Sequence, residues 1–226
     1  MARDPIEQID LHLLRIAFPS SPSLHLWVDP LRDACREFGI DTVREVASFL
    51  ANIAVESRDL TRLEESFNYS PERLRALFGR HRISDEQCRR LGRRPGEKVV
   101  PIERQRQIAN VLYGGKWGRE NLGNVYPDDG WLFRGCGAKQ LTGRANYEKC
   151  AKALGMKVED LPAYMRTREG ACRSAGWFWK SHNLDAKAAT PGVRDDRIAI
   201  NGGTNGLEVV EPRFNKLVKE LLRRGC

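Results

Sequence analysis

Apolar residues recur at helical spacing over most of the chain. The clearest run lies in residues 42–57, where apolar side chains repeat every three or four positions. Asp41 or Thr42 can cap the start of this run, and Glu45 stands three residues after Thr42 as the partner in a capping box. The pattern therefore predicts a helix from about 42 to 57.

The same periodicity predicts further helices, several of them bounded by proline or glycine. These helices are expected over residues 6–18, 29–39, 70–78, 102–113, 145–154, 168–181 and 212–224. Strand patterns are few, and residues 63–67 and 131–139 are the best candidates for a small sheet. The expected class is α+β, predominantly α-helical. The chain is expected to form a single domain, residues 1–226, in which about 71–125 form an inserted smaller helical lobe, without a separate binding module.

Composition and charge narrow the class of partner. The chain has 226 residues, of which 30% are charged and 41% hydrophobic, as in an ordinary soluble globular protein. Its net charge of +8 favours an anionic partner, either the bacterial envelope surface or nucleic acid. Arginine-rich runs at 80–82 and 89–94 could bind phosphates, but no nucleic-acid-binding motif accompanies them, so a basic nucleic-acid-binding protein is the remote alternative.

The cysteines and histidines carry no metal or redox motif. Six cysteines are present without a Cys-x-x-Cys pair, and the four histidines are scattered, so we expect no metal and no cofactor. The first residues are polar, and no apolar run of about 18 residues occurs, so we expect neither a signal peptide nor stable membrane insertion. We therefore expect synthesis in a reducing cytoplasm, where most of the cysteine thiols stay free.

Two glutamates carry the candidate chemistry. On the helix of residues 42–57, Glu56 lies at the edge of the apolar stripe beside Phe49 and Ile53, where a carboxyl group is partly desolvated as a general acid requires. Glu65 follows nine positions later, and the two can cooperate only if the chain turns between them. Carboxyl groups in different environments can divide the acid and base roles of glycosidic hydrolysis. Exposed glutamates are common on amphipathic helices, so these two glutamates alone do not establish a catalytic role. The neighbouring segments provide the further evidence.

Two further segments provide the material of a substrate groove. Residues 129–147 are rich in glycine, aromatic and short polar side chains, which allow close approach of a ligand. Residues 200–207 form a turn-rich run with two asparagines, whose amides can bind sugar hydroxyls or whose backbone can adopt left-handed turns.

With these three segments in this order, the chain resembles glycoside hydrolase family 19, most closely the lysozyme-like endolysins of bacteriophages within it. The plant-type chitinases are better-known relatives. The resemblance extends from residues 27–31 to the last predicted helix. It implies a lysozyme-like two-lobed fold with the small sheet at the active-site cleft.

The resemblance also implies roles for individual residues. Glu56 matches the general acid and Glu65 the general base, with Glu64 a bystander, and Thr142 matches the residue that fixes the attacking water. The positions implied in substrate binding are Asn68, Tyr69, Gln140, Asn146 and Asn201. The family mechanism is inverting, for which the two carboxyl groups are expected roughly 6.5–9.5 Å apart.

Several residues depart from the family pattern. Val55 stands where histidine is common, and Cys136 and Lys139 replace an arginine and an aliphatic residue. Val210 occupies the position of an arginine that touches the catalytic carboxylates, and Arg213, one turn later, is a candidate substitute.

These observations favour an endolysin-type peptidoglycan hydrolase, a muramidase that cleaves β-1,4 bonds and lyses the host. A chitinase is the alternative because both polymers share this linkage, and a wall-binding protein without catalysis is disfavoured by the presence of Glu56, Glu65 and Thr142. We expect a monomer whose partners are peptidoglycan and the anionic envelope, made in the host cytoplasm and acting on the wall after membrane permeabilisation.

Overall fold

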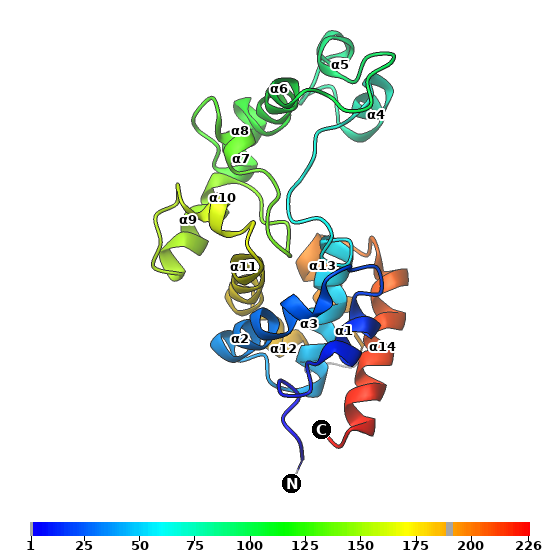
Figure 1. The fold of residues 1–226 in the computed structure, drawn as a ribbon. Helices are drawn as coiled ribbons and strands as arrows, with labels where there is room; N and C mark the ends of the chain where they lie inside the picture. The colour runs from blue at the N-terminus through cyan, green and yellow to red at the C-terminus, as the bar shows by residue number, and fades with distance from the viewer. Residues whose placement is uncertain (1, 189–191) are drawn as a thin grey trace. The chain divides into compact units, whose positions relative to one another are not determined.

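The computed structural model describes residues 2–188 and 192–226, which divide into two compact units. The first unit combines the chain up to Leu63 with Gly137–Gln140 and Ala163–Cys226, and the second consists of Glu64–Cys136 and Leu141–Pro162. Both units are predominantly helical (Figure 1).

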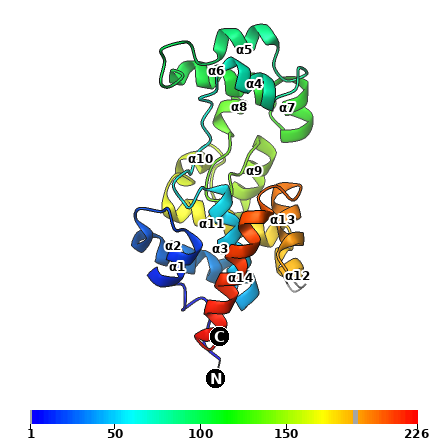
Figure 2. The same ribbon diagram turned by 90° about the vertical axis from the view of Figure 1, so that its right-hand side faces the viewer.

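The first unit is built around α3 (Val43–Glu56). This helix is buried over most of its length and packs along α14 (Leu207–Arg223), while α2 (Val28–Phe38) packs on α11 (Arg168–Ser181) (Figure 2). A helix that is apolar on nearly all sides must be surrounded by other elements. The remaining helices of this unit are α1 (Leu11–Ala17), η1 (Leu24–Trp27), α12 (Leu184–Ala188) and α13 (Arg194–Asn201).

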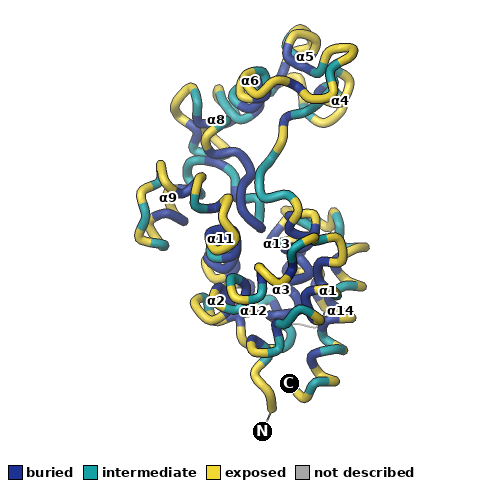
Figure 3. The backbone as a smooth tube through the Cα atoms, viewed as in Figure 1, coloured by how far each residue is buried: buried dark blue, intermediate teal, exposed yellow. Residues whose placement is uncertain are grey.

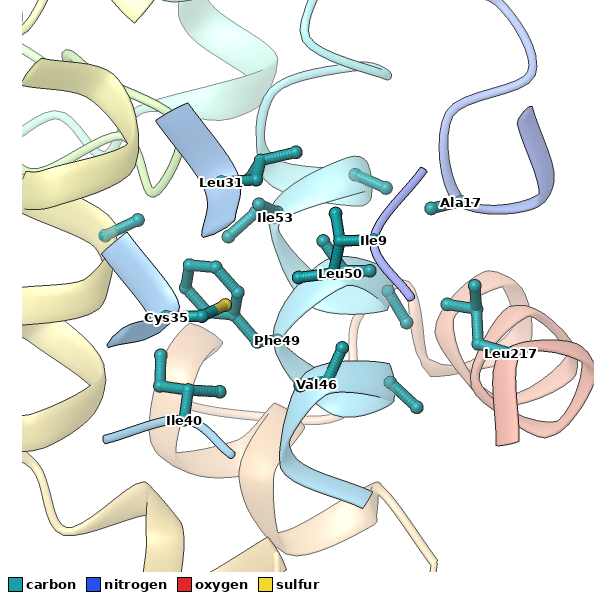
Figure 4. Close-up of a cluster of buried hydrophobic side chains, with 14 of the residues drawn as sticks. Ile9, Ala17, Leu31, Cys35, Ile40, Val46, Phe49, Leu50, Ile53 and Leu217 are labelled. Carbon is teal, nitrogen blue, oxygen red and sulfur yellow. The ribbon is translucent and has the colours of Figure 1, made fainter. Parts of the chain in front are cut away.

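The core of the first unit surrounds the middle of α3. Phe49, Leu50 and Ile53 project from this helix into a cluster that Leu31 of α2 and Leu217 of α14 complete (Figure 4). Phe49 also meets Trp179 of α11 edge to face, with ring centroids 5.8 Å apart. Packing on several sides fixes the axis of α3, and therefore the position of its last residue, Glu56.

Local structure defines both ends of α3. At its start, Thr42 Oγ1 accepts a hydrogen bond from Glu45 N at 3.2 Å and the Glu45 carboxylate accepts one from Thr42 N at 3.0 Å, which confirms the predicted capping box. After Glu56 the chain turns sharply, since Arg58, Asp59 and Leu60 have φ angles of 50°, 57° and 61°. The turn required between Glu56 and Glu65 is therefore present.

Tertiary contacts hold this left-handed turn. Each non-glycine residue in the left-handed region costs about 1–2 kcal/mol. The buried Asp59 carboxylate accepts hydrogen bonds from Arg213 Nη1 at 2.6 Å and from Ser20 N at 3.1 Å, which ties the turn to α14 and to the segment before η1. Ser57 Oγ also accepts from Leu60 N at 2.9 Å. The turn is thus stabilised both by a contact within its own segment and by contacts with distant segments.

The second unit has its own smaller core. α6 (Ile102–Tyr113) packs on α8 (Asp129–Leu132). The buried cluster of this unit combines Ile108, Ala109 and Leu112 of α6 with residues of α4 (Pro71–Leu77) and α5 (Asp85–Leu91), and Figure 3 marks buried residues in dark blue. Asp129 is fully buried and pairs with Arg144 at 2.7 Å, which fixes the start of α9 (Arg144–Ala153) against α8. The other helices are α7 (Gly115–Leu122) and α10 (Leu161–Tyr164), and α10 crosses the boundary between the units.

The predicted helices are present, two of them with shifted starts, whereas α5, α7, α10, α12 and α13 lie outside the predicted ranges. α1 begins at Leu11 instead of residue 6, because the Asp10 side chain accepts from Leu13 N and caps the helix there. α14 begins at Leu207 and contains Pro212 inside it, although we expected the helix to begin at this proline. The fully buried Val210 lies in the additional residues, and its packing stabilises them.

The expected small sheet is not confirmed. Within the described ranges the pairing consists of isolated bridges, Glu64 with Cys136 and Cys136 with Leu141. Trp131 and Leu132, expected in a strand, belong to α8. Glycines at 130, 135 and 137 favour turns over a continuous ladder here. The inserted lobe of about 71–125 remains a prediction, and these residues lie within the wider second unit.

Two further features bear on the sequence expectations. None of the helices in the described ranges combines the length and apolar character needed to span a membrane. The six cysteines have free thiols, and burial raises the pKa of Cys35 and Cys172.

We expect Asp59→Ala to lower the free energy of unfolding by about 3 kcal/mol, because the substitution leaves Arg213 without its partner and removes an anchor of the left-handed turn. Asp33→Ala is the matched control, since it also removes an aspartate paired with an arginine, but an exposed one that contributes at most about 1 kcal/mol. Urea denaturation of both variants measures the difference. Equal losses of stability would contradict the anchoring role.

Candidate active site

Glu56 ends α3 in an ion pair with a buried arginine. Its Oε1 atom accepts a hydrogen bond from Arg197 Nη1 at 2.6 Å, and the Glu56 side chain is 15% exposed while that of Arg197 is 3% exposed. A charge-assisted hydrogen bond in such a setting fixes both partners. The contact presents one carboxylate oxygen to the guanidinium and leaves Oε2 for another partner.

Arg197 is itself held from several sides. Its Nε atom donates to Asn205 O at 2.7 Å, and Asn201 Nδ2 donates to the same carbonyl oxygen at 3.4 Å. A Cβ atom at Gly206 would lie 3.1 Å from Arg197 Nη2, so the turn approaches the guanidinium closely. The run of residues 200–207 therefore supports the arginine that contacts Glu56.

A buried hydrogen bond between α13 and α3 fixes the helix that carries Arg197. The neighbouring residue Asp196 is 1% exposed, and Ser48 Oγ of α3 donates to its Oδ2 atom at 2.5 Å. Burial raises the pKa of Asp196 to about 6, against the opposing effect of the Ser48 hydroxyl. Arg197 thus projects from a helix that is fixed to the one that carries Glu56.

Lys139 and Gln140 complete the polar group in the first unit. Burial lowers the pKa of Lys139, while the Glu56 carboxylate opposes this shift, and Lys139 Nζ lies 4.5 Å from the centroid of the Phe178 ring. Gln140 has a left-handed backbone (φ 57°), and its Nε2 atom donates to Gly137 O at 3.0 Å and Arg62 O at 3.3 Å. A strained non-glycine residue of this kind is a common feature of functional sites.

Glu65, in the second unit, accepts hydrogen bonds from two neutral donors. Its Oε1 atom accepts from the Tyr113 hydroxyl at 2.8 Å, and Oε2 accepts from Gly135 N at 3.2 Å. Its own N–H donates to Gly135 O at 2.8 Å, so backbone and side chain are fixed by one segment. Hydrogen-bond donors stabilise an ionised carboxylate, which is the form that can accept a proton from water.

Aromatic rings and one cation lie behind Tyr113. The Arg82 guanidinium is 3.8 Å from the centroid of the Trp117 ring and 5.3 Å from that of Tyr113, and its Nε donates to Leu112 O at 3.0 Å. Burial is the main cause that raises the pKa of Tyr113, with the Glu65 carboxylate second. Tyr113 therefore keeps its proton and acts towards Glu65 as a donor.

Glu64 and Glu65 are distinguished by their partners. The Glu64 carboxylate forms an ion pair with Arg134, whose side chain is 7% exposed and stacks on the Trp131 ring at 3.5 Å. This ion pair joins two segments that are 70 residues apart in the chain. Glu65, with its neutral donors, is the carboxylate suited to accept a proton.

The other residues expected in substrate binding fall into two groups within the second unit. Thr142 is half-buried just before α9, and its carbonyl oxygen accepts from Asn146 Nδ2 at 2.9 Å, so this asparagine fixes the turn that presents Thr142. Asn68 Oδ1 accepts from Val100 N at 2.9 Å, which gives the side chain a structural task, and Tyr69 packs edge to face on Phe67.

Sequence reasoning missed the partners of both glutamates. Arg213, the candidate substitute for the family arginine, contacts Asp59 and not Glu56 in this structure, while Val210 is buried in the core. Arg197 contacts Glu56 instead. The sequence contained one signal for Arg197: it is an arginine at a position where helical periodicity would place a buried residue. No sequence signal linked Tyr113 to Glu65, because the two residues are 48 positions apart in the chain.

No group of three or more metal-ligating side chains is present within the described part of the chain. Each unit carries one candidate carboxyl group: Glu56 in the first contacts a guanidinium, and Glu65 in the second accepts from a tyrosine hydroxyl. Such a contrast is what acid–base division between two carboxyl groups requires.

Comparisons with known proteins agree with this chemistry. No family model matches the sequence. A protein of Haemophilus influenzae described as a glycosyl hydrolase family 19 domain-containing protein is 30% identical over 164 residues, which is 72% of this chain and 72% of that protein.

Solved structures show the same fold. Chitinase C from Streptomyces griseus HUT6037 matches with a TM-score of 0.58 at 16% identity, over 94% of this chain and 92% of the chitinase. A bacterial family 19 chitinase gives 0.58 at 17% identity, over 94% of each chain. The class IV chitinase from Zea mays gives 0.50 at 16% identity, over 96% of this chain and 88% of that chain. Together with the sequence relative, they show that the chain belongs to glycosyl hydrolase family 19 and is a glycoside hydrolase.

Proposed function

We propose that this glycoside hydrolase is an endolysin-type muramidase that cleaves the β-1,4 bonds of peptidoglycan by an inverting mechanism with two glutamates. The observation that carries the proposal is the contrast between Glu56, held by Arg197, and Glu65, held by the Tyr113 hydroxyl and Gly135 N–H. Inverting hydrolysis needs one carboxyl group that donates a proton and another that accepts one from water.

Glu56 is the proposed general acid. Because the Arg197 guanidinium donates to Oε1, the transferable proton resides on Oε2. On the proposed pathway this proton passes to the glycosidic oxygen as the bond to the anomeric carbon breaks. The carboxylate that forms is then stabilised by Arg197, which acts through Glu56 as a positioning residue.

Glu65 is the proposed general base. It takes a proton from a water that attacks the anomeric carbon from the opposite face of the sugar ring, and Thr142 fixes that water through its hydroxyl. The proposed contacts to the sugar come from Gln140, Asn146 and Asn201, with Tyr69 as a neighbouring surface. Asn68 supports this segment through Val100 and Lys98.

The choice of peptidoglycan rests on charge. The net charge of +8 attracts a polymer whose peptides carry carboxylates, whereas chitin is neutral. On this proposal the enzyme is a monomer, made in the host cytoplasm, that reaches the wall after the membrane is permeabilised. A chitinase is the second candidate, because the solved structures of similar fold are chitinases.

Glu56→Gln should lower kcat on purified peptidoglycan by at least about 100-fold, because an amide cannot donate the proton. Binding of the variant to sedimented walls should be retained. Mass spectrometry of wild-type digests with labelled reducing ends identifies the product, and muramic acid at the new end is expected. Cleaved peptides without new reducing sugars would refute the proposed reaction.

Glu65→Gln and Glu64→Gln form a matched pair at adjacent positions. We expect the first to lower kcat by at least about 100-fold with little loss of stability, because the base is removed but the amide is of similar size. The second should lower the thermal midpoint, because the buried Arg134 loses its charged partner, and retain most of kcat at a temperature where the variant is folded. The reverse result would exchange the roles of the two residues.

Arg197→Met should lower kcat about 10-fold and alter the pH–rate profile while KM changes little, because the carboxyl group of Glu56 loses the donor that orients it. Arg194→Met is the control, since it removes an exposed arginine from the same helix. Kinetics and thermal midpoints are measured for both variants. A fall in stability without a change in the pH profile would mean that Arg197 is only structural.

A further inference from the structure

Lys139 is a half-buried cation of the first unit that the proposed mechanism does not use. It lies in the short segment Gly137–Gln140, directly before a proposed sugar contact. The family pattern has an aliphatic residue at this position, so the ammonium group is a particular feature of this chain. A lysine is seldom buried unless a partner compensates for its charge. The surroundings of Lys139 therefore indicate what the charge does.

The Lys139 side chain is held between helices of the first unit. It lines a small cavity of about 10 Å³, whose walls include Ile53 of α3 and Phe178 of α11. Its Nζ atom lies 4.5 Å from the centroid of the Phe178 ring, which is the range of a cation–π contact. The backbone is also tied to α11, since Ala138 N donates to Ala171 O at 3.4 Å. Among the described lining residues, Lys139 alone is ionisable.

Two walls of this cavity lead directly to the candidate acid and its arginine. Ile53 lies one helical turn before Glu56 on α3, and Ile200, which also lines the cavity, lies one turn after Arg197 on α13. Burial lowers the pKa of Lys139, the Glu56 carboxylate opposes this shift, and the Arg197 guanidinium adds to it. Glu56 thus has two cations in its surroundings, Arg197 in hydrogen-bond contact and Lys139 at longer range.

Several other charged groups on the neighbouring helices have different partners. The pairs are Arg213 with Asp59, Lys180 with Asp185, and the Asp196 carboxylate with the Ser48 hydroxyl. His182 stacks on the Phe178 ring, with ring centroids 3.8 Å apart. These contacts leave Arg197 and Lys139 as the cations that act on Glu56 within the described part of this unit.

We infer that Lys139 is a positioning residue for Glu56: its ammonium group is the second cation, beside Arg197, that acts on this carboxyl group and sets the pH at which the proposed general acid releases its proton. The inference rests on the proposed function through the acid role of Glu56. A nearby positive charge favours the ionised carboxylate, and a partly buried setting weakens the screening of this effect by solvent. Without Lys139, Glu56 keeps its proton to higher pH.

Lys139→Met should move the alkaline limb of the kcat/KM pH profile upward by at least about 0.5 pH unit, because Glu56 stays protonated at higher pH. Lys139→Arg keeps the charge and should keep the wild-type limb. Lys219→Met is the control, since it removes the same charge from an exposed position on α14. Both peptidoglycan and chitin oligosaccharides are used as substrates. An unchanged limb in Lys139→Met, or an equal shift in Lys139→Arg or Lys219→Met, would overturn the inference.

A carboxyl NMR titration without substrate separates this inference from the proposed function. The Glu56 signal is followed in protein with isotope-labelled glutamate and is assigned by its loss in Glu56→Gln. We expect its titration midpoint to rise by at least about 0.5 pH unit in Lys139→Met and to stay unchanged in Lys139→Arg. Equal midpoints in the wild type and Lys139→Met would overturn the role of Lys139. A raised midpoint in a protein that cleaves neither polymer would support that role and overturn only the proposed function.

Discussion

The left-handed turn at Arg58–Leu60 is the constraint on which the candidate chemistry depends. It ends α3 directly after Glu56 and starts the segment that leads to Glu65. Three consecutive non-glycine residues with positive φ are unfavourable in an isolated chain. Asp59 makes the turn stable in the folded protein, because its buried carboxylate contacts Arg213 of α14 and Ser20 N.

Arginine has two tasks in this basic chain. Buried or partly buried arginines neutralise specific acids and join segments that are distant in sequence: Arg197 with Glu56, Arg134 with Glu64, Arg144 with Asp129, and Arg213 with Asp59. A buried carboxylate is costly unless it is paired with a cation or accepts hydrogen bonds. Exposed arginines, such as Arg89 and Arg90 of α5, contribute to the positive surface charge. The net charge alone does not distinguish these tasks, whereas burial does.

Local signals predicted the helices because their causes are local. The capping box at Thr42 and the left-handed Gly39 after α2 depend on neighbouring residues, and they mark the elements as expected. The additional residues of α14 before Pro212 depend on the burial of Val210, which no local pattern reveals. The expected sheet was not confirmed for the same reason, since strand pairing depends on residues far apart in the chain.

The sequence by itself determined the longer helices, the two candidate glutamates and the family, because periodicity and motifs are properties of consecutive residues. Tertiary structure decided the partners of the charged groups. Arg197 contacts Glu56 across 141 residues, Arg213 contacts Asp59 across 154, and Tyr113 contacts Glu65 across 48. Any of several arginines could have reached Glu56 from its place in the sequence. Only the packing of α13 and α14 around α3 selects Arg197 for this contact, because an ion pair forms where folding brings two charges within hydrogen-bond distance.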